Sequence, residues 1–377
     1  MKHATIQVHA LQSQSHRQPT GRLLPVALAL VGLLLLSACG SNNASSLVSG
    51  PRTVPTPSIS PTQQNEGKMA LATFQQWINL MQQSGGDVTT YQQQYQSDQQ
   101  ALQQAQTASA YSRALTTLKE HINAIQIPAM KAESTHLQQQ LAQEVSAWGK
   151  VHTYHDAYNN QTYPLGYEYG SQGIGGSLWL GEELSQAQSL AGYQQVVEDL
   201  QMWLTNFEAM KANFSDKTPY NQPHKTDLDL LRHYGYMDKR VVVVSLSEQA
   251  LRAYDHGKLV KAFLVTTGQP DLPTPPGTWW IESKQHPTIF KSSEPKGSPH
   301  WYPDTKINYA MQYHSNGYFL HDAWWRADFG PGTNFPHQDA TGDPFAGQGS
   351  HGCVNMSTDN AAWLYNFVSL YTPVLIY

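Results

Sequence analysis

One cysteine near the C-terminus of the chain lies among glycines and two residues after a histidine, in GQGSHGCVNM at residues 347–356. The sequence has two cysteines, and the other, Cys39, ends an apolar run near the N-terminus. Glycines at this density indicate a loop whose backbone turns tightly or approaches a ligand, which is a poor setting for a buried structural thiol. Cys353 is therefore a candidate for chemistry.

Two kinds of site suit this cysteine. A zinc site needs about four ligands, and His321, His337, His351 and Cys353 could supply them, but histidine and cysteine at positions i and i+2 do not give the usual zinc geometry, so we expect no metal. A nucleophilic thiol needs a base, because its ordinary pKa of about 8.5 leaves little thiolate at neutral pH. His351, and His321 at the end of the apolar stretch GYFLHDA, are the candidate bases. The backbone N–H groups of Gly352 and Cys353 could bind a developing oxyanion.

The elements that would position these residues lie in the last third of the chain. β-branched runs and alternating apolar residues predict short strands, and a helix is expected from Ser357, its N-cap, to Leu370. Residues 240–377 therefore predict a mainly β domain with one main helix. The predicted strands lie at 240–246, within a hairpin at 250–268, at 278–282, within 316–323 and at 373–377.

An earlier region has a different pattern. Apolar residues spaced by three and four between residues 68 and 215, such as Tyr111, Leu115 and Leu118, predict amphipathic helices. Pro128 and the glycine-rich stretch 166–176 are expected to break the series. We predict an all-α bundle of about four helices at 68–215, joined by a connector at 216–239 to the β domain.

The N-terminus has the pattern of an exported lipoprotein. A basic segment precedes a 14-residue apolar run at 23–36, which is shorter than the roughly 20 residues of a membrane span. The run ends in Leu-Ser-Ala-Cys, which resembles a bacterial lipobox, so Cys39 is the expected lipidation site. We predict a signal peptide at 1–38, a disordered Ser/Pro-rich tether at 39–67, and a lipid anchor in the outer face of the cell membrane. A net charge of −5 argues against a nucleic-acid partner.

The segment SHGCVNMSTDNAAW resembles the active-site signature of the L,D-transpeptidase (YkuD-type) catalytic domain. GYFLHDA is similar to the motif that supplies the catalytic histidine of that family, and residues 241–281 resemble its opening strands and Pro-Gly loop. The resemblance covers residues 240–377 and leaves the helical region out. Together with the bundle predicted from apolar spacing, this gives a two-domain chain, in which an all-α bundle precedes a mainly β catalytic domain.

The resemblance also implies roles for individual residues. Cys353 would be the nucleophile and His321 the general base, while His351 and Gly352 would shape the oxyanion site. Asn355 stands where many relatives have arginine, so a positive charge beside the sulfur would be missing. The segment 322–352 is long for the family and is interpreted as a lid, with Trp324 and Trp325 as substrate-facing or core aromatics. The implied substrate contacts are Tyr302, Ser350 and Asn355.

By the same resemblance the substrate is a peptidoglycan stem peptide. Cys353 would attack the carbonyl of its third residue, expel the terminal D-amino acid, and pass the acyl group to the side-chain amine of a second stem. The product would be a crosslink between third residues. The alternatives are trimming of tetrapeptide stems by water, as an L,D-carboxypeptidase, and a non-catalytic lipoprotein that binds the cell wall. We expect a monomer outside the cytoplasm that needs no cofactor.

Overall fold

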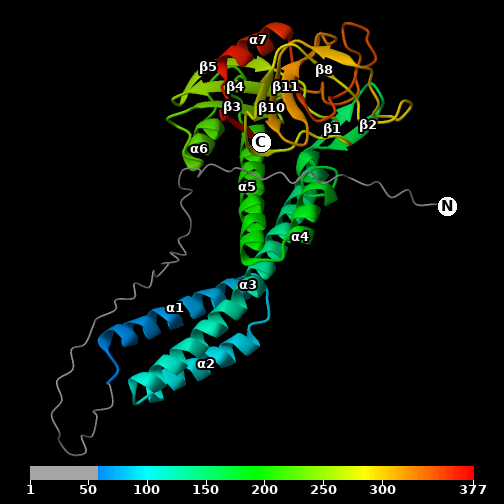
Figure 1. The fold of residues 1–377 in the computed structure, drawn as a ribbon. Helices are drawn as coiled ribbons and strands as arrows, with labels where there is room; N and C mark the ends of the chain where they lie inside the picture. The colour runs from blue at the N-terminus through cyan, green and yellow to red at the C-terminus, as the bar shows by residue number, and fades with distance from the viewer. Residues whose placement is uncertain (1–57) are drawn as a thin grey trace, which may run out of the picture.

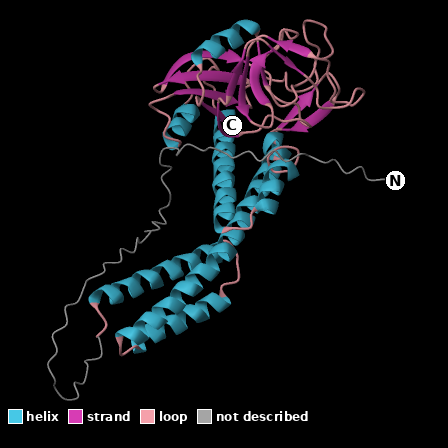
Figure 2. Cartoon of the chain, in the orientation of Figure 1, coloured by secondary structure: helices cyan, strands magenta, loops and turns pink. Residues whose placement is uncertain are grey.

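The computed structural model describes residues 58–377, so the signal peptide at 1–38, Cys39 and most of the predicted tether lie outside the described residues. Long helices form an elongated lower part of the molecule, and the strands gather in a domain at its upper end (Figures 1 and 2). Within residues 58–377, none of the helices combines the length and the apolar character needed to cross a membrane.

The helical part is built mainly from four helices: α1 (Pro61–Gln83), α2 (Thr89–Gln104), α3 (Ala108–Val151) and α5 (Leu190–Phe214). Residues 61–67 belong to α1, so the predicted end of the tether at residue 67 was wrong. The reason is a local signal: Ser60 and Gln63 form a capping box, in which each side chain accepts a hydrogen bond from the other's backbone N–H. The far end of this part packs around Phe74, Trp77 and Leu118, all buried.

Pro128 does not break the helical series. It lies inside α3, which continues for 44 residues. A proline in a helix interior removes one backbone hydrogen bond, but helix packing can outweigh that loss. Here α3 packs against α1 and α2 along one half and against α5 along the other, so both halves are held by neighbours.

A hairpin interrupts the helical region, which is therefore not all α as predicted. It consists of β1 (Thr153–Asp156) and β2 (Gln161–Pro164), which pair antiparallel. Its strands have four residues each and lack a clear apolar alternation, so the sequence pattern did not indicate them. A 3-10 turn (Tyr167–Tyr169), a π turn (Ser177–Gly181) and α4 (Glu182–Gln186) follow, and α6 (Lys225–His233) lies in the connector.

The β domain has two main sheets. One has five strands in the order β5-β4-β3-β13-β6, and the other has four in the order β12-β11-β10-β7, with β8 and β9 forming a separate pair. Helix α7 (Thr358–Phe367) begins after Ser357, whose side chain accepts the Asn360 N–H, so the predicted N-cap is confirmed. The strands are β3 (Arg240–Ser245), β4 (Ala250–Asp255), β5 (Lys258–Leu264), β6 (Gly277–Trp280), β7 (Ser283–Gln285), β8 (Thr288–Phe290), β9 (Thr305–Ile307), β10 (Ala310–His314), β11 (Tyr318–Asp322), β12 (Val354–Met356) and β13 (Pro373–Ile376).

The helical region and the β domain share one apolar core. Trp203 and Phe207 of α5 belong to the same buried cluster as Val243 of β3 and Leu375 of β13. The Asn206 side chain of α5 also donates a hydrogen bond to the Ile376 carbonyl, 3.1 Å away. The two parts are therefore joined by packed helix and sheet rather than by a free linker.

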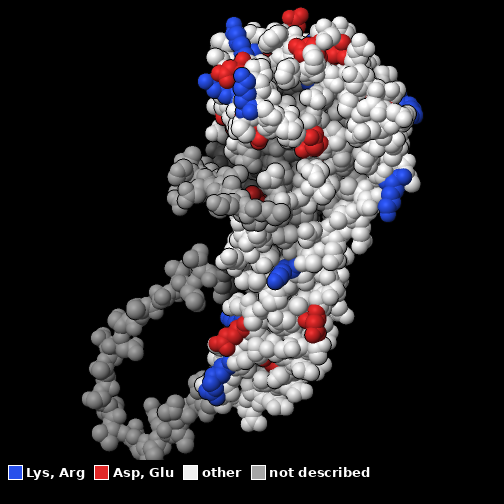
Figure 3. All heavy atoms as spheres, turned by 90° about the vertical axis from the view of Figure 1, so that its right-hand side faces the viewer, with Lys and Arg blue, Asp and Glu red and all other residues white. Residues whose placement is uncertain are grey.

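Charged side chains are sparse on the molecular surface. Figure 3 shows a mostly uncharged face, with some Lys, Arg, Asp and Glu residues grouped at the upper left and others standing apart. This matches a sequence with only 14% charged residues. The face drawn in Figure 3 carries no continuous basic stripe.

Candidate active site

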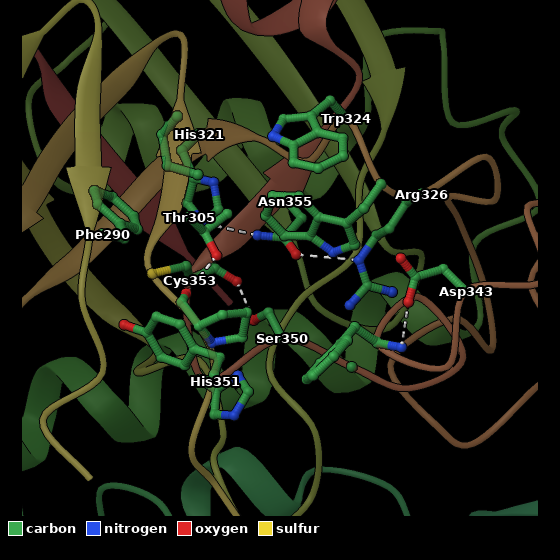
Figure 4. A pocket seen from close by; sticks show the side chains of 16 residues that line it. Phe290, Thr305, His321, Trp324, Arg326, Asp343, Ser350, His351, Cys353 and Asn355 are labelled. Atoms are coloured by element: carbon green, nitrogen blue, oxygen red, sulfur yellow. Dashed lines mark hydrogen bonds between the residues drawn. The ribbon is translucent and has the colours of Figure 1, made fainter. Parts of the chain in front are cut away.

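Two neighbouring strands place the candidate residues on one face of the four-stranded sheet. β11 and β12 run parallel, with His321 opposite Asn355. Cys353 lies in the bend directly before β12 (Val354–Met356), and its side chain lines the same pocket as that of Asn355. The backbone of Thr266 pairs with Asn355 on the opposite edge and fixes this segment from both sides. The sheet therefore brings Cys353, His321 and Asn355 to one pocket (Figure 4).

The turn before Cys353 depends on Gly352. Its φ of +99° lies in a region that side chains disfavour, and a Cβ there would be 2.5 Å from the Tyr318 ring. The Ser350 hydroxyl accepts the Gly352 N–H at 3.1 Å and donates to the Cys353 carbonyl at 2.5 Å. Ser350 thus braces the turn that presents the sulfur.

Hydrogen bonds at both ring nitrogens define the state of His321. Nδ1 lies 2.8 Å from the Asp322 carbonyl oxygen, which can only accept, so Nδ1 carries the proton. Nε2 lies 2.9 Å from the Asn355 side-chain nitrogen and accepts from it. Burial lowers the pKa of His321 to about 4. The hydrogen bond to the Asp322 carbonyl raises this pKa, whereas the charge of Arg326 lowers it further. The imidazole is therefore neutral at pH 7, with a basic Nε2.

The thiol of Cys353 is also neutral at pH 7. Burial raises its pKa to about 11, although a hydrogen bond from the Phe319 backbone opposes this shift. Its sulfur lies 3.9 Å from the Gly317 carbonyl oxygen, and among the described residues no hydrogen bond joins it to His321. The Asn355 amide donates a hydrogen bond to Nε2 of His321, so it must move away before Nε2 can accept the thiol proton.

The pH dependence of this pair is a testable consequence. Alkylation by uncharged iodoacetamide needs the thiolate, so its rate constant should stay low at neutral pH and rise toward an inflection near the Cys353 pKa of about 11. Acylation by a substrate needs neutral His321, which is lost only as pH falls through about 4. Both profiles can be measured by intact mass against pH. An alkylation inflection below pH 8 would contradict a neutral thiol–imidazole pair.

Aromatic side chains form much of the pocket wall. Tyr302 lies with its ring centroid 5.3 Å from that of His351, and its hydroxyl donates to the Lys291 carbonyl. Burial lowers the pKa of His351, so this ring adds no charge at pH 7. Among the predicted aromatics, Trp324 is 58% exposed at the rim, and the Trp325 ring lies 6.3 Å from that of His321. Phe290 and Phe345, which the sequence did not single out, also line the pocket.

The segment predicted to be a lid borders the pocket and is tied to the helical region. Phe335 is buried, and its ring stacks on Tyr154 at 4.3 Å and on Tyr163 at 5.1 Å, both from the β1–β2 hairpin. Tyr167 adds an edge contact and donates to the Gly268 carbonyl at 2.6 Å, beside the segment that pairs with Ser350. The helical region therefore holds the lid and the backbone beside the cysteine turn.

Removing the Phe335 ring should loosen the lid. Phe335→Ala deletes a buried aromatic anchor, and a loss of about 3 kcal/mol of local stability is expected. Hydrogen exchange should show lower protection for amides between residues 323 and 349, with protection of α1 and α2 unchanged. Phe345→Ala is the matched control, because this ring is 47% exposed on the same segment. Equal protection in Phe335→Ala and wild type would contradict the role of the hairpin.

Arg326 brings a positive charge from the lid to Asn355. It donates from Nε to the Asn355 side-chain oxygen at 3.2 Å, while the expected lack of a positive charge beside the sulfur itself stays a prediction. The two residues are 29 positions apart, and Arg326 lies in a segment without periodicity, so no sequence signal pointed to this contact. A guanidinium from the lid thus joins the site.

His337, the remaining ligand considered for a metal, lies elsewhere on the lid, with Nδ1 2.8 Å from the Phe335 carbonyl. Within residues 58–377, no group of three or more His, Cys, Asp or Glu side chains is placed to hold a metal ion. The pocket around Cys353 presents thiol, imidazole, amide and guanidinium groups.

Comparisons with known sequences agree with the motifs of the β domain. The family model of the L,D-transpeptidase catalytic domain, YkuD, matches residues 239–376. L,D-transpeptidase 1 of Mycobacterium tuberculosis is 27% identical over 140 residues, which are 36% of this chain and 50% of that protein. Probable L,D-transpeptidase 3 of the same species is 30% identical over 112 residues, or 29% of this chain and 36% of that protein. The match thus spans half or less of these relatives.

Solved structures are similar over the same part of the chain. An L,D-transpeptidase from Mycobacterium smegmatis is 25% identical with a TM-score of 0.31, and the match covers 37% of this chain and 58% of that one. An L,D-transpeptidase solved in complex with imipenem has the same identity and TM-score, with 37% and 59% covered. A mutant of the Enterococcus faecium L,D-transpeptidase is 27% identical at a TM-score of 0.31, with 37% and 50% covered.

The helical region lies outside the family match, which begins at residue 239. The matched part contains both main sheets, the turn at Gly352 and the strands that carry His321 and Asn355. Residues 239–376 of this chain therefore form a YkuD-type L,D-transpeptidase catalytic domain.

Proposed function

We propose that this protein is a peptidoglycan L,D-transpeptidase that uses Cys353 as its nucleophile. The observation that supports this most directly is the placement of Cys353 and a neutral His321 in one aromatic-lined pocket of a catalytic domain of this family. The substrate is a stem peptide ending in a D-amino acid, and the product is a crosslink between the third residues of two stems.

The reaction begins with substrate entry and a shift of the Asn355 amide away from Nε2. His321 then takes the thiol proton while the sulfur attacks the carbonyl carbon of the third residue. Because both groups are neutral beforehand, the thiolate exists only as the C–S bond forms. The backbone N–H groups of Gly352 and Cys353, with His351 at the same turn, are the proposed oxyanion site.

Collapse of the tetrahedral intermediate breaks the amide C–N bond, and His321 returns its proton to the departing amine. The free D-amino acid leaves, and the acyl group stays on sulfur as a thioester. The side-chain amine of a second stem then attacks the thioester carbonyl and gives a proton to His321. The new C–N bond forms as the C–S bond breaks, and His321 passes that proton to the departing sulfur, which regenerates the thiol. Tyr302, Ser350 and Asn355 are the proposed contacts around the bound peptide.

Location and anchoring complete the proposal. The first described helix starts at the end of the helical part that lies away from the β domain (Figure 1). With a lipid on Cys39 in the outer face of the cell membrane, the tether and this helical part would act as a spacer toward the cell wall. We expect the protein to work there as a monomer without a cofactor, since the proposed steps use only its own side chains.

Purified disaccharide-tetrapeptide tests the function directly. Wild-type protein should release the terminal D-amino acid and form crosslinked dimer, both measured by chromatography and mass spectrometry. Release without dimer would favour the carboxypeptidase, in which water resolves the thioester. Cys353→Ala is the control, and equal product from this variant and wild type would contradict the proposal. No product from either protein would favour a non-catalytic wall-binding lipoprotein.

A further inference from the structure

Arg326 places a buried positive charge in the pocket without a negative partner in contact. The side chain is 7% exposed. Its hydrogen bonds go to neutral acceptors, from Nε to the Asn355 side-chain oxygen at 3.2 Å and from Nη1 to the Ala346 carbonyl at 2.7 Å. Among residues 58–377 no carboxylate forms an ion pair with it. A buried charge in a folded protein is ordinarily paired, so this guanidinium lacks its usual complement.

The unused donors of Arg326 face the substrate space. Arginine has five N–H groups, and Nη2 makes no hydrogen bond with the described residues. The side chain lines the pocket together with Cys353, and Figure 4 shows its guanidinium beside Asn355. Burial lowers the pKa of Arg326 to about 10, so the group is desolvated but still charged at pH 7.

Nearby carboxylates do not contact the Arg326 guanidinium. Asp339 accepts hydrogen bonds from the Ala327 and Asp328 amides, and Asp343, which also lines the pocket, accepts from the Phe345 amide at 2.9 Å. Both raise the pKa of Arg326 through longer-range attraction without contacting it. Among residues 58–377, Nη2 therefore has no hydrogen-bonding partner and remains available to a bound molecule.

We propose that Arg326 is a specificity-determining residue that binds a carboxylate of the donor peptide in the pocket of Cys353. The inference rests on the proposed function and adds which chemical group of the substrate the pocket selects. A planar carboxylate matches the geometry of a guanidinium, and a charge-assisted hydrogen bond is stronger in a site that excludes water. His321 and His351 are neutral, which leaves Arg326 as the cation of the pocket lining.

Two carboxylates of a stem peptide have this chemistry. One ends the departing D-amino acid, and the other belongs to the side chain of the third residue when that residue is a diamino dicarboxylic acid. Either would be bound one hydrogen bond away from Asn355, which itself contacts His321. A carboxylate bound at Arg326 would therefore also affect the position of the Asn355 amide when His321 must act as the base.

Four synthetic donor tetrapeptides separate these sources. They combine a free or amidated C-terminus with a third residue that has or lacks its side-chain carboxylate. Wild-type protein should lose about 10- to 100-fold in kcat/KM for release of the terminal residue when the recognised carboxylate is removed, because a buried donor is then left unpaired. The other carboxylate should matter much less.

In Arg326→Met the preference for the recognised carboxylate should fall to near one, whatever happens to the overall rate. Arg326→Lys should keep part of it, because lysine retains the charge but not the planar fork. Lys306→Met is the matched control: it removes an exposed positive charge near the pocket and should leave the preference unchanged. This ratio is a readout that a purely structural role of Arg326 in the lid would not alter.

Two results would overturn the inference: an undiminished preference in Arg326→Met, and wild-type rates equal on all four peptides. Failure of the proposed function looks different, because wild type would then release nothing from any peptide and would equal Cys353→Ala. Thermal unfolding of Arg326→Met distinguishes a folding defect from a loss of carboxylate recognition. If Arg326→Met unfolds at the assay temperature, Arg326→Lys is used for the test instead. A carboxylate preference in Arg326→Lys that is as large as in wild type and in Lys306→Met would contradict recognition by the planar guanidinium.

Discussion

Cys353→Ala is expected to lose acyl transfer by at least about a thousandfold, because an enzyme that loses its nucleophile retains only what binding and oxyanion donors contribute. The measurement is intact mass after incubation with imipenem, whose strained lactam carbonyl is an acyl donor. Wild-type protein should gain the mass of one imipenem molecule, and the alanine variant should gain none. The sequence also contains Cys39, so Cys353 is identified as the acylated residue by loss of the adduct in Cys353→Ala, which keeps Cys39.

Two further variants show what the adduct depends on. His321→Gln keeps the thiol but removes the base, so it should still react with iodoacetamide at high pH and be acylated far more slowly than wild type. Asn355→Ala removes the side-chain amide that donates to Nε2 of His321. Comparing this variant with His321→Gln distinguishes loss of ring positioning from loss of the base itself. An imipenem adduct on Cys353→Ala at the wild-type rate would contradict the proposed nucleophile.

Asp227→Ala should cause the largest loss of stability. Asp227 of α6 and Arg252 of β4 are both fully buried, with Nε 2.5 Å and Nη2 3.2 Å from the carboxylate oxygens. The hydroxyls of Tyr254 and Tyr377 also donate to this carboxylate. Removing it leaves a buried guanidinium with only Glu248 as an acidic partner, and about 3–5 kcal/mol of the free energy of unfolding should be lost.

Urea unfolding of the whole protein, followed by tryptophan fluorescence, measures this loss. Asp229→Ala is the matched control on the same helix, because Asp229 pairs with Lys225 and Arg232 on the surface. Exposed ion pairs contribute about 0–1 kcal/mol, so this variant should unfold close to wild type. Equal midpoints for Asp227→Ala and Asp229→Ala would show that the buried pair contributes little.

The sequence by itself determined the local parts of this protein. The Ser-His-Gly-Cys segment, the apolar strand that ends at His321 and the N-cap at Ser357 are signals within a few residues, and strand period and capping chemistry act over that range. They were sufficient to predict a helical region followed by a mainly β catalytic domain. Where a local signal was misread, at Ser60 and at Pro128, the errors concerned a boundary and a break rather than the type of element.

Only the tertiary structure decided what surrounds the sulfur. Arg326 reaches Asn355 from an irregular loop, and Phe335 meets Tyr154 from a hairpin of the helical region that lies far earlier in the chain. Such contacts depend on how loops without periodicity pack, so no spacing in the sequence encodes them. The protonation states follow the same rule: the neutral thiol and imidazole arise because burial removes water from both groups, and burial exists only in the folded chain.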